Sequence, residues 1–288
     1  MEPVESTPDL RTIVREARER GKRIGLVPTM GALHEGHVAL MRQCREHADF
    51  IVASIFVNPT QFGAGEDFGR YPRPLEYDQR QCESAGVDLV FVPSVQTVYP
   101  RGTASTFVEV PGLSAVLEGA SRPGHFRGVA SVVLRLFELV RPDVAVFGQK
   151  DFQQQLVLKR MVDDLHVPVE LVVAPTLRDS DGLALSSRNR YLNADERRAA
   201  TILYRALESA RSAVATGERR AERIRQILQD TVKSESGAKL DYAEVADGET
   251  LEPLGDLGEV KTAVALLAAW VGTTRLIDNA LLHERASH

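Results

Sequence analysis

The sequence is poor in cysteine and contains no long apolar segment. Its cysteines are Cys44 and Cys82, and neither has a CxxC partner or belongs to a cysteine framework, which favours a reducing compartment. The longest apolar stretch, Ala263–Val271, falls short of the ~18 to 20 residues that a membrane span needs. Residues 1–20 lack the apolar core of a secretory signal. We therefore expect a cytoplasmic protein without a membrane segment.

The sequence also lacks an excess of positive charge. The formal net charge is −5 and the sequence pI is near 5.9. Such a chain has no basic surface of the kind that neutralises a phosphate backbone, so we expect no nucleic-acid partner. The 288 residues exceed the common single-domain size of roughly 100 to 200 residues, which predicts one large or two unequal domains.

Residues 1–177 alternate short β-branched runs with longer amphipathic segments. This alternation is typical of βαβ units and predicts an α/β, Rossmann-like domain, with helices on both faces of a parallel sheet. Apolar runs place strands at Ile24–Pro28, Phe50–Val57, Asp88–Pro93, Val144–Gly148 and Val169–Ala174. Periodicity places helices at Asp9–Arg20, His37–His47, Pro74–Ala85, Val129–Val140 and Phe152–Leu165.

Two segments of this domain have weaker patterns. Thr106–Pro111 is a candidate for an extra strand, and Gly112–Gly128 contains enough Gly, Pro and Ser to predict an irregular loop. The pattern then changes, and residues 178–288 predict a smaller α+β domain, which we expect to act as a lid. Its elements are helices over Ala194–Ala215 and Arg220–Lys233, and strands near Asp241–Val245, Lys261–Trp270 and Thr274–Leu282.

The first strand runs into a glycine turn and a helix start, Thr29–His37. A glycine turn, a helix N-terminus with unpaired N–H groups and the carboxyl end of a parallel strand together predict a phosphate site. His34 and His37 are three residues apart and can both donate to phosphate or ribose oxygens. The alternative is that both are ordinary capping or surface histidines.

Other interpretations of the histidines fail on spacing. Gly31–Gly36 has the spacing of a P-loop, but His37 stands where that loop needs lysine. Zinc proteases need histidines four residues apart. A zinc site that also used Cys44 and His47 would have to join positions about 20 Å apart along one helix.

Three further polar segments follow predicted strands or lie in a loop. Gln61, after the second strand, can bind hydroxyls and a carboxylate, or can be a turn residue. Lys150 can neutralise phosphate charge, and Asp151 beside it can bind ribose or cap the helix. Ser186, Ser187 and Arg188 can clamp a phosphate, although such a loop can also be an interdomain linker.

Together, the histidine turn and the Ser-Ser-Arg loop resemble the motif pair of the nucleotidylyltransferase superfamily. Within it, five segments in order are similar to the pantothenate synthetase family. They are Pro-Thr-Met-Gly-Ala-Leu-His-Glu-Gly-His at 28–37, Ser-Ile-Phe-Val-Asn-Pro-Thr-Gln-Phe at 54–62, Tyr-Pro-Arg at 71–73, Phe-Gly-Gln-Lys-Asp at 147–151 and Asp-Gly-Leu-Ala-Leu-Ser-Ser-Arg-Asn at 181–189. The similarity extends from about Thr12 to Ala280.

The resemblance implies an AMP-forming amide ligase. It would condense pantoate with β-alanine through a pantoyl adenylate, release AMP and diphosphate, use ATP with Mg²⁺, and act as a cytoplasmic homodimer. The ATP contacts it implies are Met30, Gly31, Ala32, Leu33, His34, Glu35, Gly36, His37, Gly148, Gln149, Lys150, Asp151, Leu177, Leu185, Ser186, Ser187 and Arg188. The substrate contacts it implies are Gln61, Gln154 and Asn58.

Catalysis by this family implies a role for six of these residues. His37 is the family's catalytic histidine, and His34, Lys150, Ser186, Ser187 and Arg188 would spread negative charge on the leaving group. The chain departs from the family pattern at Gln149, where many members have Glu, and at Leu185, where they have Met.

The magnesium ligands are left unassigned, although Asp78 and Gln81 lie one helical turn apart. Two other functions stay open at this point. One is a nucleotidylyltransferase that acts on a phosphorylated substrate, and the other is a non-catalytic nucleotide-sensing module.

Overall fold

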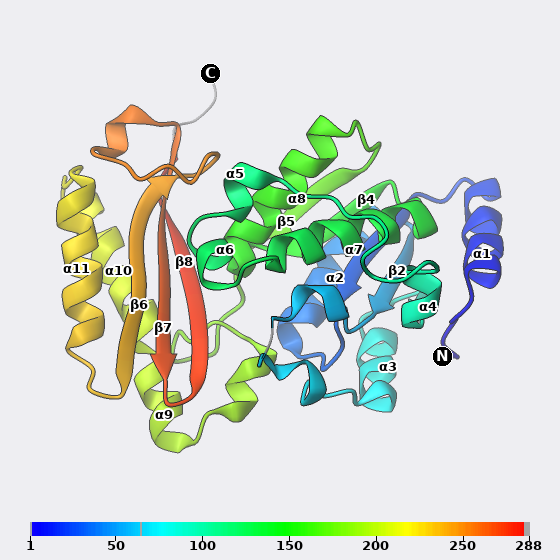
Figure 1. The fold of residues 1–288 in the computed structure, drawn as a ribbon, viewed down its shortest axis with the longest axis horizontal. Helices are drawn as coiled ribbons and strands as arrows, with labels where there is room; N and C mark the ends of the chain where they lie inside the picture. Colours follow the sequence, from blue (N-terminus) through cyan, green and yellow to red (C-terminus); the bar gives the residue numbers. More distant parts are fainter. Residues whose placement is uncertain (1, 64, 285–288) are drawn as a thin grey trace. The chain divides into compact units, whose positions relative to one another are not determined.

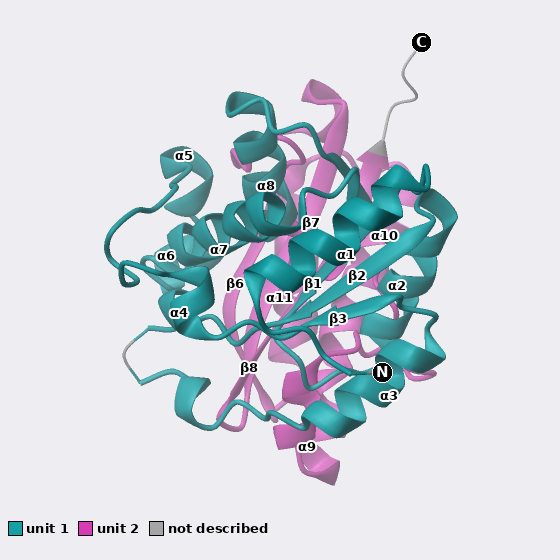
Figure 2. Cartoon of the chain, turned by 90° about the vertical axis from the view of Figure 1, so that its right-hand side faces the viewer, with its two compact units in different colours: residues 1–149, 153–175 teal, residues 150–152, 176–288 magenta. Residues whose placement is uncertain are grey.

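The computed structural model describes residues 2–63 and 65–284 and divides into two compact units, shown in Figure 1 and coloured separately in Figure 2. The first unit comprises Met1–Gln149 and Gln153–Pro175. The second comprises Lys150–Phe152 and Thr176–His288, so three residues after β4 group with the C-terminal part of the chain. The predicted roles of residues 1–177 as a binding domain and of 178–288 as a lid stay predictions.

The first unit is built on a five-stranded parallel sheet of order β3-β2-β1-β4-β5. Its strands are β1 Ile24–Thr29, β2 Phe50–Ile55, β3 Leu89–Phe91, β4 Val144–Gly148 and β5 Glu170–Ala174. The strand order reverses between β1 and β4. In such sheets, the carboxyl ends beside the reversal form the usual ligand-binding crevice.

Helices cover both faces of this sheet. Consecutive strand side chains point to opposite faces, yet Leu26 and Val27 are both fully buried. Val27 packs in a cluster with α2 and α3, whereas α1 and α7 contact each other and β1. The helices of this unit are α1 Thr7–Glu19, α2 Glu35–His47, α3 Leu75–Ser84, α4 Val95–Val98, α5 Pro111–Ser114, α6 Glu118–Ser121, α7 His125–Val140 and α8 Phe152–Asp164, of which the first residue belongs to the second unit. The predicted α/β class is confirmed.

The predicted extra strand at Thr106–Pro111 is wrong. Residues 106–110 form neither helix nor strand, and side chains of α7 bind their backbone. The Val108 N–H donates to Ser131 Oγ over 2.8 Å, and Arg135 Nη2 donates to the Thr106 carbonyl over 2.7 Å.

The predicted irregular loop at Gly112–Gly128 is wrong in part, because it contains α5, α6 and the start of α7. Gln153 orders this segment from α8. Its Nε2 donates to the carbonyls of Leu113 and Val116, and its Oε1 accepts from the Glu118 N–H. These bonds link residues far apart in sequence, so local composition could not predict them.

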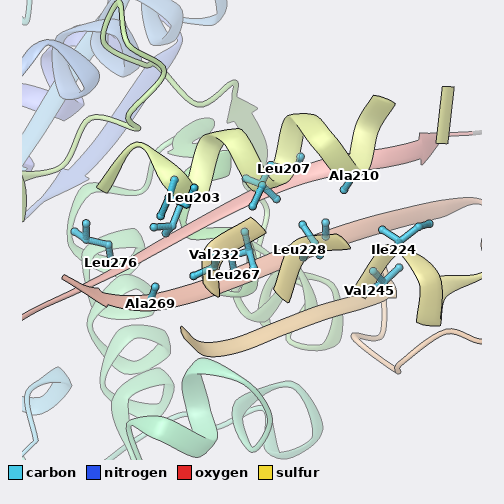
Figure 3. Packing of buried hydrophobic residues seen from close by; sticks show 14 of the residues in the cluster. Leu203, Leu207, Ala210, Ile224, Leu228, Val232, Val245, Leu267, Ala269 and Leu276 are labelled. Atoms are coloured by element: carbon cyan, nitrogen blue, oxygen red, sulfur yellow. The ribbon is translucent and has the colours of Figure 1, made fainter. Parts of the chain in front are cut away.

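The second unit is α+β, as predicted. Its antiparallel sheet has the order β6-β7-β8 and is covered by helices. Figure 3 shows Leu203 and Leu207 of α10 and Leu228 of α11 packed with Leu267 of β7. Its elements are α9 Ala194–Ala200, α10 Ile202–Ala215, α11 Ala221–Lys233, β6 Ala238–Asp247, β7 Thr262–Val271 and β8 Thr274–Glu284.

The single helix predicted over Ala194–Ala215 is divided at Thr201. The Thr201 hydroxyl donates to the Arg198 carbonyl over 2.8 Å, a local bond that competes with helix continuation. Thr201 then becomes the C-cap of α9 and the N-cap of α10.

Both cysteines are free and buried in helices of the first unit. Burial, slightly offset by Arg45, raises the pKa of Cys44 to about 11, and burial with the nearby Asp78 charge raises that of Cys82 to about 12. Both thiols therefore stay protonated near neutral pH and unreactive. Within residues 2–63 and 65–284, no helix is long and apolar enough to cross a membrane.

Candidate active site

The histidine turn connects β1 to α2, and the side chain of Asp78 on α3 accepts hydrogen bonds from its backbone. This carboxylate is 1% exposed, and its two oxygens accept the N–H groups of Ala32 and Leu33, each over 2.8 Å. Gly31 has φ of +79°, and an added Cβ would lie 2.8 Å from Asp78 Oδ2. The turn therefore requires a glycine at position 31 and a carboxylate at position 78.

The two histidines cap the first turn of α2 with their own side chains. His34 Nδ1 accepts the Gly36 N–H over 3.2 Å, and His37 Nδ1 accepts the His34 N–H over 3.3 Å. The predicted unpaired N–H groups at this helix start are thus partly occupied. Because Nδ1 accepts in both rings, the neutral form of each carries its hydrogen on Nε2. The ring centroids are 4.1 Å apart, so the capping geometry creates two neighbouring donors.

Gln61 lies beside this turn, in a 3₁₀ turn that follows β2 (Pro59–Gln61). Its side chain is 8% exposed, and its Nε2 donates to the sulfur of Met30 over 3.1 Å. Its Oε1 accepts from Asn58 Nδ2 over 3.1 Å. The structure thus brings three predicted site residues together at the carboxyl ends of β1 and β2.

Asn58 is 1% exposed, and protein groups occupy its amide. Its Nδ2 also donates to the Gly128 carbonyl, and its Oδ1 accepts from the Tyr99 hydroxyl over 2.7 Å and from Thr60. Burial raises the pKa of Tyr99, so its hydroxyl stays protonated and able to donate. Asn58 therefore orients Gln61, while direct contact between Asn58 and a substrate stays a prediction that these bonds do not favour.

Helix α7 supports the Gln61 turn at very short range. A Cβ at Gly128 would lie 2.3 Å from the Thr60 carbonyl oxygen and 2.7 Å from the Gln61 Cα. His125 Nδ1 donates to the Gln61 carbonyl over 2.8 Å, and its Nε2 faces Arg122 at 3.1 Å. Burial and the Arg122 charge lower the pKa of His125 to about 4, so the ring is neutral near pH 7.

Arg122 in turn forms two bonds to Glu66, of 2.7 Å and 2.6 Å. Burial opposes ionisation of this carboxyl, but the bonds from Arg122 outweigh it and keep the Glu66 pKa below its usual value. The turn is therefore anchored by a chain of groups that runs from Glu66 through Arg122 and His125.

The third group of predicted residues in the first unit follows β4. Gly148 ends this strand and lies against Leu40 of α2, which places it beside the histidine helix. Gln149 follows it and is partly buried, as is Gln154 on α8. The neighbouring Gln153 is 4% exposed and bonded to the α5–α6 segment, so the two adjacent glutamines have different surroundings.

Lys150 is the first predicted site residue in the second unit. Its side chain is 20% exposed, and its Nζ lies 3.9 Å from Asp151 Oδ1. Its carbonyl accepts a hydrogen bond of 2.9 Å from Asn279 Nδ2 on β8. Lys150 therefore presents a cation from a backbone position that the C-terminal sheet fixes.

The predicted phosphate loop is a narrow hairpin in the second unit. The Leu185 N–H donates to the Leu177 carbonyl over 3.0 Å, and the Asp179 N–H donates to the Leu183 carbonyl over 2.9 Å. Ser186 follows directly and caps a 3₁₀ turn by accepting the Arg188 N–H. The segment is thus ordered by its own backbone, unlike a flexible linker.

Ion pairs hold this hairpin from two sides. Arg178 binds Asp278 with both terminal nitrogens, over 2.6 Å and 2.9 Å. On the exposed side, Arg197 binds Asp179 and Asp181, each over 2.7 Å.

Comparison with known proteins decides which family these features represent. A family model described as pantoate-beta-alanine ligase matches residues 2–281. The pantothenate synthetases of Moorella thermoacetica and Pelotomaculum thermopropionicum are 52% and 53% identical to this chain. They cover 98% and 95% of it, and the matches cover 99% and 96% of their own lengths. The chain belongs to the pantoate–β-alanine ligase family.

Solved structures agree with this membership of the pantoate–β-alanine ligase family. The pantothenate synthetase of Thermus thermophilus matches with a TM-score of 0.92 and 46% identity, over 98% of this chain and 100% of that one. The pantoate-β-alanine ligase of Francisella tularensis, complexed with beta-gamma ATP and β-alanine, matches with a TM-score of 0.80 and 34% identity, over 98% of each chain. The predicted resemblance, fold class and ligase function are confirmed.

Sequence reasoning on this pantoate–β-alanine ligase missed the residues that support its site. Asp78 was considered only for magnesium, although a buried carboxylate on two turn N–H groups is its observed role. Gly128 and His125 support Gln61, and Asp278 and Asn279 support the second unit. The short sequence Ile-Asp-Asn-Ala, in which two polar residues stand between apolar ones of a strand, was the one signal available for the last two, because buried polar residues need partners.

Proposed function

We propose that this chain condenses pantoate with β-alanine at the expense of ATP, through a bound pantoyl adenylate, and releases pantothenate, AMP and diphosphate. The observation that carries this proposal is the contact between Gln61 and Met30. It places a buried amide, suited to hydroxyl and carboxylate groups, directly beside the turn that is suited to ATP phosphates. The ATP and β-alanine named in the Francisella tularensis complex support the same pair of ligand classes.

In the proposed first step, a pantoate carboxylate oxygen attacks the α-phosphorus of ATP. The new O–P bond forms as the bond to the diphosphate oxygen breaks, and negative charge builds on the leaving group. We assign His34 and His37 to that charge, because an imidazole that accepts a hydrogen bond at Nδ1 carries its donor hydrogen on Nε2. Gln61 and Gln154 would hold the pantoate.

In the second step, the β-alanine amine attacks the activated carbonyl, AMP leaves with the electrons of the acyl C–O bond, and the nitrogen loses a proton to solvent as the amide forms. We assign Lys150, Ser186, Ser187 and Arg188 to the phosphate charge in both steps, since they supply cations and hydroxyl donors. The other predicted ATP contacts complete this proposal. They are Met30, Gly31, Ala32, Leu33, Glu35, Gly36, Gly148, Gln149, Asp151, Leu177 and Leu185.

In this proposal, magnesium binds together with ATP, and no protein ligand is assigned to it. Among residues 2–63 and 65–284, no group of three or more His, Cys, Asp or Glu could hold a metal ion. Both oxygens of Asp78 already accept backbone N–H groups, so its surroundings do not fit the magnesium role considered for it with Gln81. No step is assigned to a metal held by the protein. The homodimer and the cytoplasmic location stay proposals that come from the resemblance.

Diphosphate release tests this function directly. With ATP and pantoate alone, we expect a burst of about one diphosphate per active site and an enzyme-bound adenylate, followed by steady release of AMP and pantothenate once β-alanine is added. A nucleotidylyltransferase would instead release a stable adenylylated product without β-alanine. A nucleotide sensor would bind ATP and release no diphosphate. Either result would contradict the proposal.

A further inference from the structure

Two adjacent residues of β8, Asp278 and Asn279, contact both phosphate-directed parts of the second unit. They are 4% and 3% exposed and lie between Ile277 and Ala280 of the strand. Buried polar side chains cost free energy unless they are hydrogen bonded, so their partners define their role. One contacts the hairpin that leads to Ser186–Arg188, and the other contacts Lys150.

Asp278 fixes the hairpin through Arg178. The two carboxylate oxygens meet the two terminal guanidinium nitrogens in a bidentate pair, the strongest geometry for such a contact. Arg178 also donates to the Gly182 carbonyl over 3.1 Å and lies 4.8 Å from the centre of the Tyr204 ring. One side chain thus links β8 and α10 to the tip of the hairpin.

The hairpin tip is packed too closely to shift independently. A Cβ at Gly182 would lie 2.0 Å from the Tyr204 ring, and Gly182 has φ of +90°. Asn189 Nδ2 donates to the Ala184 carbonyl over 3.0 Å, which closes the chain around the intervening segment. The position of Ser186–Arg188 is therefore set by the position of the hairpin.

Asn279 fixes Lys150 from the other face of the same sheet. Consecutive residues of a strand point to opposite faces. Asp278 shares its face with Leu276 and Ala280, which pack in the helix-covered core, whereas Asn279 points the other way and donates to the Lys150 carbonyl over 2.9 Å. The Asn279 backbone N–H also donates to Asp278 Oδ1 over 2.8 Å, so a hydrogen bond couples the Asp278 side chain to its neighbour.

We propose that Asp278 and Asn279 are positioning residues that hold Lys150 and the Ser186–Arg188 loop in a fixed relation for adenylate formation. The proposal rests on the proposed function, because Lys150 and this loop matter together only if both act on ATP. A rigid strand then carries both groups, and a displacement of about 1 Å at either one can cost on the order of 100-fold in rate.

The first test removes the Asn279 donor. We expect Asn279→Ala to lower the kcat of diphosphate release about 10- to 100-fold, with the KM for pantoate and the melting temperature nearly unchanged. Combined with Lys150→Ala, Asn279→Ala should add less than about twofold, because it acts through Lys150. An unchanged kcat in Asn279→Ala would overturn the proposal. So would a double variant whose kcat falls by the product of the two single-variant losses.

The second test addresses the hairpin without leaving a buried charge unpaired. Arg178→Lys keeps the positive charge but cannot form the bidentate pair with Asp278, and we expect it to lower kcat about tenfold. When it is combined with Arg188→Ala, kcat should fall little further than in Arg188→Ala alone. The matched control is Arg275→Lys on the same strand, whose guanidinium pairs with Asp241 of β6. Equal losses in Arg178→Lys and Arg275→Lys would show a general effect on the sheet and overturn the proposal.

Wild-type turnover separates the two proposals. If the wild-type protein releases no diphosphate with ATP and pantoate, the proposed function fails. If it does so and Asn279→Ala matches it, the positioning role alone fails.

Discussion

Two segments supply the groups proposed to bind phosphate. They are Met30–His37 and Leu177–Asn189, the second of which contains the hairpin, and different forces hold them in place. The first is held by backbone bonds, with the buried Asp78 on two N–H groups and the two histidines on their own helix start. The second is held by ion pairs, one to the buried Asp278 and two from Arg197 to the exposed Asp179 and Asp181.

The difference follows from the charge that each segment supplies. The histidine turn offers the positive end of a helix dipole and imidazole N–H donors, so the carboxylate of Asp78 can accept and stabilise its backbone N–H groups. The second segment supplies a full cation in Arg188. Its other arginine, Arg178, pairs with Asp278, and its own carboxylates, Asp179 and Asp181, pair with Arg197 of α9. Backbone bonds to a buried group are insensitive to salt, whereas exposed ion pairs are screened by it.

The largest effect is expected from Lys150→Ala, which tests whether the second unit contributes charge rather than stability. Loss of one donor to developing charge typically costs about 2 to 4 kcal/mol of transition-state stabilisation. We expect kcat/KM for adenylate formation to fall accordingly, while the urea unfolding midpoint stays unchanged. Lys150→Arg, which keeps the charge, is the control, and near-normal turnover of the alanine variant would refute the role.

The second prediction concerns close packing in the first unit. Gly128→Ala places a methyl group against the Thr60 and Gln61 backbone, which cannot move aside as a side-chain end could. We expect the free energy of unfolding to fall by about 2 to 3 kcal/mol and the KM for pantoate to rise, measured by urea denaturation and steady-state kinetics. Gly112→Ala, where the added Cβ meets nothing within 4 Å, should change neither. Equal behaviour of the two variants would contradict the packing argument.

The third prediction separates a turn-holding role of Asp78 from a metal role. Asp78→Asn turns one acceptor into a donor that faces an N–H group, which should cost about 2 kcal/mol of folding stability and weaken ATP binding. Isothermal titration of ATP with and without magnesium measures the second effect. The loss of ATP affinity should be the same with and without magnesium. A loss that appears only when magnesium is present would favour a metal-binding role for Asp78. Glu76→Gln, exposed on the same helix, is the control.

The fourth prediction uses pH to loosen the Gln61 turn. The folded pKa of His125, about 4, is below its unfolded value, so the unfolded chain binds more protons between them. The stability from this residue is therefore complete above about pH 6.5 and is lost as pH falls toward 4. We expect a loss on the order of 2 kcal/mol by about pH 5. His125→Asn should remove this part of the pH dependence of the melting temperature, and an unchanged profile would contradict it.

The smallest effect is expected from Arg197→Gln, which tests the exposed ion pairs of the hairpin. The side chains of Asp179 and Asp181 are 42% and 44% exposed, so the loss of stability should stay below about 1 kcal/mol and vanish at high salt. Proteolysis near residues 179–189 should become faster in the variant, and ATP should slow it in both proteins. No protection by ATP would count against the clamp.

The sequence predicted the segments that carry chemistry but little of what holds them. Apolar runs located all five strands of the first sheet, since buried strands need apolar residues on both faces. It also predicted the histidine turn and the Ser-Ser-Arg loop, because glycine, capping and charge patterns are local. It failed at Thr106–Pro111 and Gly112–Gly128, where side chains of α7 and α8 decide the backbone.

Residues 28–37, 54–62, 147–151 and 181–189 thus determined by themselves the family and the class of ligands, because the chemistry of ATP and an acid substrate needs those residue types in that order. The tertiary structure decided which atoms of these side chains are engaged within the protein. It assigned the hydrogen of the neutral His34 and His37 rings to Nε2, turned Asp78 and Asn58 into supports, and joined Lys150 to the hairpin through Asp278 and Asn279. The reason is physical: a hydrogen bond depends on distance and angle, and Lys150 and Asn279, which are 129 positions apart in sequence, acquire both only when the second unit folds.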